Sequence, residues 1–177
     1  MSLGDVGGAR RTSIIGYVTD SRFPIPDSQP SQSSSHIPSR RRLLAIDYGE
    51  RRIGLAVSDP TGTIASPAGH LVRRAGKRPP IAAMIARGEE LEAEGFVLGL
   101  PLDDQGDDTP RATEVRHIAA ELEKRTGLPA VLVDERYTPA AALRAVRAMG
   151  GSTRDRKGDV DALAATVLLQ HALDVSR

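Results

Sequence analysis

The segment LLAIDYGERRIGLAVS, residues Leu43 to Ser58, contains two short apolar runs separated by a polar turn. The gap is short enough to join the two runs as an antiparallel hairpin. A turn signal, Asp59 to Gly62, follows the hairpin, and we expect TIASP, Thr63 to Pro67, to form a third strand. The segment therefore predicts three antiparallel strands at the start of a folded domain.

Beyond these strands the pattern alternates between helix and strand signals. Apolar runs with almost no polar residue, typical of buried parallel strands, occur at Phe96–Pro101 and Ala130–Glu135. Caps, proline starts and glycine stops predict helices at Pro80–Ala93, Thr109–Gly127, Thr138–Gly150 and Asp159–Asp174. The expected fold is α/β, with a mixed five-stranded sheet flanked by helices. Three antiparallel strands followed by helix-strand alternation is the order of a ribonuclease H-like domain.

The chain before residue 43 has a different composition. Residues Ser21 to Ser39 are rich in Ser, Pro and Gln, so they cannot bury enough apolar surface to offset the entropy of ordering them. An earlier apolar run, Ile14 to Val18, could form a strand, but we expect it to have nothing to pair with. We predict that residues 1–42 are a disordered tail and that residues 43–177 are the ribonuclease H-like domain.

Composition excludes several classes of function. The 24 Lys and Arg residues nearly cancel the 23 Asp and Glu residues, so a partner chosen by bulk charge alone is excluded. There is no Cys, which excludes disulfides, thiolate metal sites and a Cys nucleophile. Any metal would be held by carboxylates, which favours Mg²⁺ or Mn²⁺. No apolar run approaches the roughly 20 residues of a membrane span, and no secretory signal is recognisable, so we expect a cytoplasmic protein.

Three acidic positions stand out because apolar neighbours would bury them. Asp47 ends the first apolar strand, although a lone Asp there could be a turn former. At the end of AVLVDE, the two-residue period puts Glu135 on the face of the apolar valines, with an ion pair from Asp134 or Glu135 to Arg136 as the alternative. Asp161 lies on the apolar stripe of the last helix. It either faces other carboxylates across a divalent cation or stabilises the first helical turn through the helix dipole.

Four segments carry a resemblance to one family: DYGERRIGLAVSDP, GLPLDDQG, VDERYT and RKGDVDALAA. In order and spacing they are similar to the signature segments of the YqgF/RuvX family of Holliday junction resolvases and pre-16S ribosomal RNA nucleases. The match covers about Leu43 to Leu173. The resemblance implies a ribonuclease H-like fold and a metal-dependent nuclease. It also implies that Asp47, Glu135 and Asp161 are catalytic and together hold Mg²⁺ or Mn²⁺.

Polar residues beside these motifs are candidate substrate contacts, through phosphate groups for the basic ones. They are Arg51, Arg52, Arg136, Thr138, Arg156 and Lys157. Aromatic residues make up 3% of the chain and Trp is absent, so we expect recognition by backbone shape and charge. Tyr137 replaces the family's usual Leu, and it could cover the site or stack on a base. We expect the partner to be nucleic acid, structured RNA or branched DNA, with no membrane, and the protein to act as a monomer or homodimer. The alternative is a non-catalytic nucleic-acid-binding module.

Overall fold

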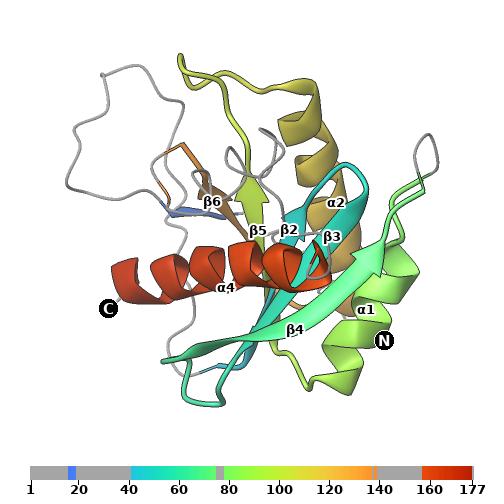
Figure 1. Cartoon of the computed structure of the whole chain (residues 1–177), viewed down its shortest axis with the longest axis vertical. Helices are drawn as coiled ribbons and strands as arrows, with labels where there is room; N and C mark the ends of the chain where they lie inside the picture. The colour runs from blue at the N-terminus through green and yellow to red at the C-terminus, as the bar shows by residue number, and fades with distance from the viewer. Residues whose placement is uncertain (1–15, 19–40, 75–77, 137, 139–156, 177) are drawn as a thin grey trace, which may run out of the picture.

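A computed structural model of the chain describes residues 16–18, 41–74, 78–136, 138 and 157–176, with the side chains of all of these except 16–18 and 157–160. Its strands are β1 (Gly16–Val18), β2 (Leu43–Tyr48), β3 (Arg52–Ser58), β4 (Ala65–Val72), β5 (Gly95–Leu100) and β6 (Ala130–Asp134). Its helices are α1 (Ile81–Glu90), α2 (Pro110–Thr126) and α4 (Lys157–Val175). These elements form one sheet with helices on both faces (Figure 1).

The sheet has the strand order β1-β6-β5-β2-β3-β4. Strands β2, β3 and β4 are antiparallel neighbours, whereas β5 and β6 run parallel to β2. Three antiparallel strands followed by two parallel ones were predicted, and the ribonuclease H-like fold is confirmed. Because β2, β5 and β6 are parallel, their carboxyl ends lie at one edge of the sheet, where ligands bind in open α/β folds.

The prediction that the early apolar run has nothing to pair with is wrong. Strand β1 pairs in parallel with β6, in the register Gly16 to Val131 and Val18 to Val133. Without β1, strand β6 would be the edge of the sheet and would present unpaired N–H and C=O groups, which another extended segment can bind. The sheet therefore has a sixth strand beyond the predicted five. Residues 1–15 and 19–40 lie outside the described part, so the disordered tail stays a prediction.

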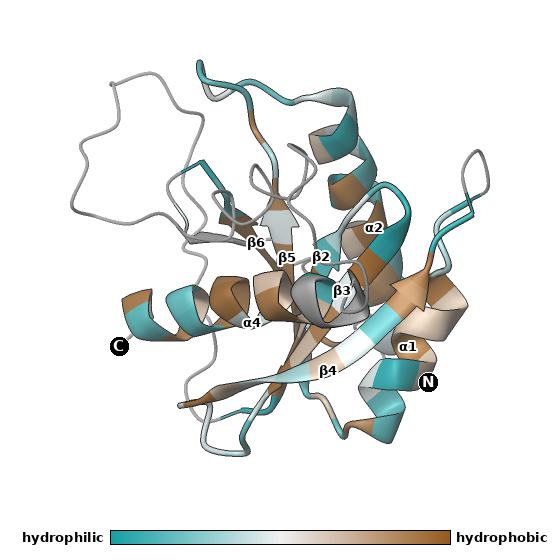
Figure 2. Cartoon of the chain, in the orientation of Figure 1, coloured by the Kyte–Doolittle hydropathy of each residue, from teal (hydrophilic) through white to brown (hydrophobic). Residues whose placement is uncertain are grey.

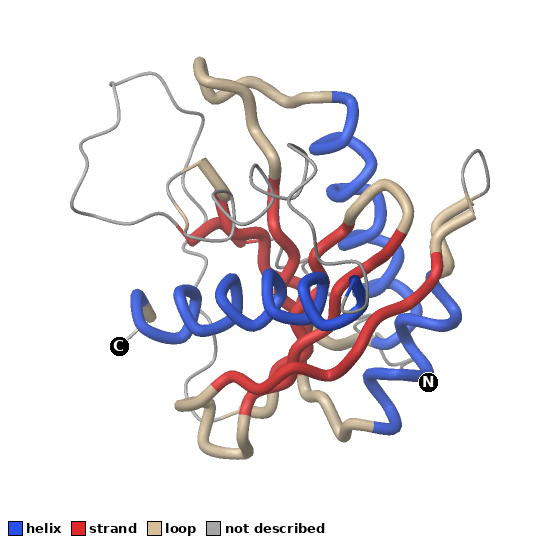
Figure 3. Tube along the Cα trace, viewed as in Figure 1, coloured by secondary structure: helices blue, strands red, loops and turns tan. Residues whose placement is uncertain are grey.

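The two faces of the sheet are covered by different helices. Helix α4 packs on β2, β3 and β4 on one face, and α2 packs on β5 and β6 on the other, with α1 beside α2 (Figures 1 and 3). Successive strand residues point to opposite faces. Leu44 and Ile46 of β2 accordingly join the core under α1 and α2, and Leu43 and Ala45 join the core under α4. Figure 2 shows hydrophobic strand segments lying between the two helical layers.

Helix α2 begins and ends where the sequence predicts. The Thr109 side chain accepts a hydrogen bond of 3.0 Å from the Ala112 N–H, and Pro110 occupies the first helical position. Gly127 ends the helix with φ at 71°, a left-handed conformation that costs glycine little. The Thr109 hydroxyl also donates to the Pro101 carbonyl, 2.7 Å away, so the cap ties the helix to the loop after β5.

Two predicted boundaries differ from the structure. Helix α1 ends at Glu90 instead of Ala93, and Glu92 beyond it has φ of 53°, a conformation that no helix continues. Strand β4 runs to Val72 and not only to Pro67. A proline is tolerated within it because β4 is an edge strand, where a missing N–H leaves no ladder bond unmade. The helix predicted at 138–150 lies outside the described residues, apart from Thr138.

Candidate active site

Asp47, the penultimate residue of β2, has a glycine beside it on each of the two neighbouring strands. Its side chain is 2% exposed and lies on the α4 face, two residues after Ala45 in the alternation of the strand. Gly54 of β3 is its cross-strand partner. On the other side lies β5, where Gly99 comes one residue after the last registered pair of the β2–β5 ladder. Asp47 also comes one residue after that pair, so the two residues are neighbours. Both neighbours of Asp47 on this face therefore lack a side chain.

The space over these two glycines is filled by the other two predicted acids. A Cβ atom on Gly54 would overlap the carbonyl oxygen of Asp161 and lie 2.6 Å from its carbonyl carbon. A Cβ atom on Gly99 would overlap Oε1 of Glu135 and lie 2.6 Å from its Cδ. Gly54 thus makes room for the α4 backbone, and Gly99 makes room for the Glu135 carboxylate. Asp47, the Glu135 carboxylate and the backbone of Asp161 therefore lie next to one another on the α4 face, at the carboxyl end of β2.

Asp161 is a residue of α4 and has no exposed surface. Helix α4 is described from Lys157 onward, and Asp161 lies in this part of the helix. It forms an ion pair with Arg52 of β3, whose Nη1 lies 3.8 Å from Oδ2 of Asp161. The interpretation in which Asp161 faces the other acids stays a prediction.

Glu135 follows β6 and is 3% exposed. Its N–H donates to the Leu100 carbonyl, 3.2 Å away, which continues the β5–β6 pairing by one residue. The backbone N–H and the hydroxyl of Thr138 both donate to the Glu135 carbonyl at 3.1 Å. Thr138 is buried, and these bonds connect it to the turn that carries Glu135, while its predicted contact with substrate stays a prediction.

The ion pair expected at this strand end belongs to Asp134. Arg136 donates to both carboxylate oxygens of Asp134, with Nη2 2.7 Å from Oδ2. Its guanidinium also lies against Gly106, where an added Cβ would be 3.0 Å from Nη1. Asp134 thus engages Nε and Nη2 of Arg136, and the predicted phosphate contact of Arg136 stays a prediction.

The remaining predicted substrate contacts differ in exposure. Arg51, in the turn between β2 and β3, is exposed, and the side chain of Arg52 is 33% exposed. Arg156, Tyr137 and the side chain of Lys157 lie outside the described residues. Substrate contact by these residues stays a prediction.

Two features of the site were not predicted. The first is the pair of glycines, Gly54 and Gly99. Gly54 lies in the segment DYGERRIGLAVSDP and Gly99 in GLPLDDQG, and membership of these segments was the available signal. The second is a polar network of Tyr48, Arg73 and Glu114 behind Asp47. Burial, with the hydrogen bond to Glu114, raises the pKa of Tyr48 far above its usual range, so the phenol stays a donor at physiological pH.

Carboxylate oxygens are suited to Mg²⁺ or Mn²⁺, and three acids that share one buried end of the sheet suit such a cation chemically. Within the described residues, however, no group of three or more His, Asp or Glu side chains is arranged to hold a metal ion. The assignment of Asp47, Glu135 and Asp161 as metal ligands therefore stays a prediction.

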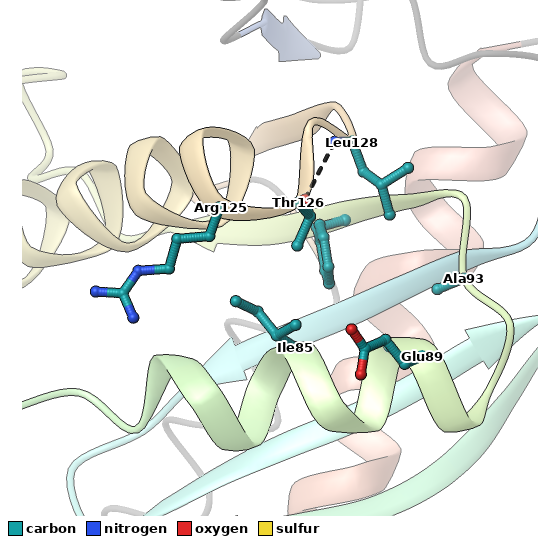
Figure 4. Close-up of a pocket in the computed structure, with 8 residues that line it drawn as sticks. Ile85, Glu89, Ala93, Arg125, Thr126 and Leu128 are labelled. Carbon is teal, nitrogen blue, oxygen red and sulfur yellow. Dashed lines mark hydrogen bonds between the residues drawn. The ribbon is translucent and has the colours of Figure 1, made fainter.

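A cavity of about 280 Å³ lies elsewhere, between α1 and α2 (Figure 4). Its lining includes Phe96 at the start of β5 and Leu128 just before β6. Phe96 belongs to the core under α1 and α2, so the cavity lies on the face opposite the three acids and toward the amino ends of the parallel strands. It is separate from the candidate active site.

The strand order and the helices on both faces define the class of the protein, a ribonuclease H-like α/β domain. Within that class, the profile of the RuvX family, described as Holliday junction resolvase, matches residues 41–175, and the chain belongs to this family. The family is one of nucleases, so the prediction of an enzyme that hydrolyses phosphodiester bonds is confirmed at this level.

Individual relatives agree with this assignment. A protein of Koribacter versatilis, described as "Putative pre-16S rRNA nuclease", is 42% identical over 75% of this chain and 86% of its own length. A Bradyrhizobium protein with the same description is 38% identical over 86% of this chain and 94% of its own. Among solved structures, Thermus thermophilus RuvC in complex with a Holliday junction substrate is 16% identical over 76% of this chain and 94% of that one, with a TM-score of 0.44. None of the helices in the described residues is long and apolar enough to cross a membrane.

Proposed function

We propose that this protein is a metal-dependent nuclease that hydrolyses phosphodiester bonds in the 5′ region of precursor 16S ribosomal RNA, in the cytoplasm. The observation that supports the proposal is the burial of Asp47, Glu135 and Asp161, with Gly99 leaving room for the Glu135 carboxylate and Gly54 for the Asp161 backbone. The choice of RNA is supported by the description that the curated relatives share.

The three acids would hold Mg²⁺ or Mn²⁺, because hard cations of this kind prefer carboxylate oxygens. When bound, such an ion lowers the pKa of its water and stabilises negative charge on the attacking and leaving oxygens. The chain supplies the rest. Burial of Asp47, Glu135 and Asp161 excludes bulk water from the carboxylates, and Gly54 and Gly99 leave room beside Asp47 for the other two residues.

Substrate binding would fall to the turn between β2 and β3. Arg51 is exposed there, and Arg52 lies within 3.8 Å of Asp161 while keeping a third of its side chain exposed. A guanidinium in this position can contact a phosphate group and the acidic site together. Arg51 and Arg52 are therefore the described residues best situated to orient a phosphodiester toward the acids.

Branched DNA is the second candidate substrate. The family's own description as Holliday junction resolvase favours it. Both substrates present a phosphodiester backbone, so the three acids would serve either one, and the difference lies in the shape of the nucleic acid that the surface accepts.

The test is cleavage by the purified full chain of two substrates, an RNA containing the 5′ precursor junction of 16S ribosomal RNA and a four-way DNA junction. Each is incubated with Mg²⁺, with Mn²⁺ or with a chelator. We expect cleavage of the RNA at a defined site with either metal, and none with the chelator. Cleavage of the DNA junction without cleavage of the RNA would contradict the proposed RNA substrate and favour branched DNA. Binding of either substrate without cleavage under any condition would leave a non-catalytic binding module.

A further inference from the structure

Arg73, the residue after β4, reaches across the end of the sheet to helix α2. Its Nη2 donates to both carboxylate oxygens of Glu114, at 2.8 and 2.9 Å. Its guanidinium carbon lies 4.4 Å from the centroid of the Tyr48 ring, within the range of a cation–π contact. The Tyr48 hydroxyl closes the network by donating to Oε1 of Glu114, 2.8 Å away. The Arg73 side chain is only 15% exposed, so most of it is unavailable to a substrate.

The same arginine holds the turn that follows Asp47. Nη1 of Arg73 donates to the Gly49 carbonyl at 3.4 Å, and its backbone N–H donates to the Arg51 carbonyl at 3.0 Å. The Gly49 N–H in turn donates to the Asp47 carbonyl at 3.0 Å. The residues after Asp47 are therefore connected, through Arg73, to a helix on the opposite face of the sheet.

A second ion pair strengthens the same connection. Arg111, also on α2, donates to Glu50 at 2.6 Å. Helix α2 thus supports the turn at two points, through Glu114 and through Arg111. The helix is itself fastened to the loop after β5 by the Thr109 cap. The backbone of Asp47 is held from behind by residues that do not reach the α4 face.

We propose that Arg73 is a positioning residue, which together with Glu114 and Tyr48 fixes the backbone of Asp47 and of the Arg51–Arg52 turn relative to Glu135 and Asp161. The proposal rests on the proposed nuclease function. Its physical reason is that the reactive geometry tolerates little error, since a misplacement of about 1 Å can reduce a rate by about 100-fold.

The first experiment compares Arg73→Met with the parent and with Arg87→Met. Arg87 is a matched control because it also joins a helix to β4, donating to the Ala68 carbonyl at 2.8 Å, but at a point away from Asp47. Two quantities are measured on the full chain, the amide hydrogen exchange of peptides covering residues 47–52 and the steady-state constants for RNA cleavage. For Arg73→Met we expect faster exchange in this segment and a kcat lowered by about tenfold or more, with KM changed much less. For Arg87→Met we expect neither change.

Each other outcome also decides the question. Unchanged exchange overturns the proposal, and so does a raised KM with unchanged kcat, which would make Arg73 a substrate contact. If the parent itself does not cleave, the proposed function fails, and the exchange measurement alone decides the role of Arg73.

A second pair of variants covers the case in which Arg73→Met does not fold. Glu114→Gln keeps the shape of the acceptor but removes the ion pair, and we expect a smaller loss of kcat in the same direction. Arg73→Lys keeps the charge, but an ammonium cannot donate to both Glu114 oxygens and to Gly49 while stacking on Tyr48. We expect Arg73→Lys to keep the melting temperature near that of the parent while kcat stays low. Full recovery of kcat by Lys would overturn the proposal, because charge alone would then be sufficient.

Discussion

The two faces of the sheet are built from alternate residues of the same strands, yet their residues differ in size. The face under α1 and α2 carries the large side chains Leu44, Ile46, Phe96, Leu98 and Leu100. The face under α4 carries smaller ones near the site, Ala45 and Ala56, with Gly54 and Gly99 beside Asp47. Large side chains bury more apolar surface and contribute more stability. Small ones let the α4 backbone approach the sheet closely enough to bury Asp161.

This difference in side-chain size gives the two faces of the sheet different roles. We infer that the α1/α2 face supplies most of the packing free energy, whereas the α4 face gives up packing volume so that three acids can lie together. Substitutions on the two faces should therefore separate stability from cleavage.

The largest expected effect is on cleavage, from Asp161→Asn. The amide keeps the shape of the side chain but loses the charge that a divalent cation requires, so cleavage should fall by orders of magnitude. The metal-free melting temperature should be equal to that of the parent or higher, because one of three neighbouring acids is neutralised. Arg52, left without its 3.8 Å partner, is partly exposed and can be solvated. The two measurements are a metal-free thermal melt and a Mg²⁺-dependent cleavage assay.

Asp174→Asn is the matched control, since Asp174 is an exposed acid at the other end of α4. It should leave both measurements near those of the parent. If Asp161→Asn cleaves as fast as Asp174→Asn, Asp161 is not part of the catalytic set.

The next prediction concerns Gly54 and Gly99, for which we expect different effects of substitution by Ala. Gly99→Ala pushes against a flexible Glu135 carboxylate, so the protein should fold and lose most of its cleavage. Gly54→Ala pushes against the α4 backbone, so both stability and cleavage should fall. The free energy of unfolding should decrease by about 1–3 kcal/mol or more. Gly88→Ala is the control, because its closest contact would be 3.1 Å, to a Phe96 ring that borders the α1–α2 cavity. Denaturant melts and cleavage rates test all three variants. Equal effects of Gly54→Ala and Gly99→Ala would contradict the different contacts assigned to them.

A smaller effect on function is expected from the α1/α2 face. Leu98→Ala removes a fully buried side chain and should cost about 2–5 kcal/mol of unfolding free energy. Cleavage per folded molecule should not change, because Leu98 points away from α4. Val97→Ala, at the next residue and on the α4 face, should cost less stability but reduce cleavage, since α4 then packs less firmly. The assignment of roles to the faces is wrong if Leu98→Ala lowers cleavage more than Val97→Ala does.

Much of the fold follows from local patterns. The apolar runs of β2, β3, β5 and β6 and the cap signals of α2 depend on residues close in sequence, and each was predicted near its observed bounds. Strand β4 was predicted too short because Pro67 reads as a stop, and only the strand order shows that it lies on an edge. The pairing of β1 could not be predicted, because its partner Val131 is far away in sequence and nothing local specifies the contact.

The site follows the same division. The two-residue period of β6 correctly predicted that Glu135 lies on the face opposite Leu132. The apolar stripe of the last helix correctly predicted that Asp161 is buried. The glycine positions depend on the register between strands, because Gly54 matters only once it is paired with Asp47. The Arg73–Glu114 contact joins the end of one strand to a distant helix, and no sequence spacing indicates it.

The smallest effect is expected from removing the tail, because all described residues of the two core clusters lie after residue 42. The described part of the tail adds three residues, Gly16–Val18, at the β6 edge, away from Asp47 and Asp161. Deleting residues 1–40 exposes that edge but removes none of the described residues of the two core clusters, so we expect the melting temperature to change by only a few degrees. Cleavage should be retained, since the Glu135 carboxylate faces Gly99 and not β1. A drop of many degrees would mean that the tail packs on the domain beyond β1. A loss of cleavage at an unchanged melting temperature would mean that β1 helps to hold Glu135.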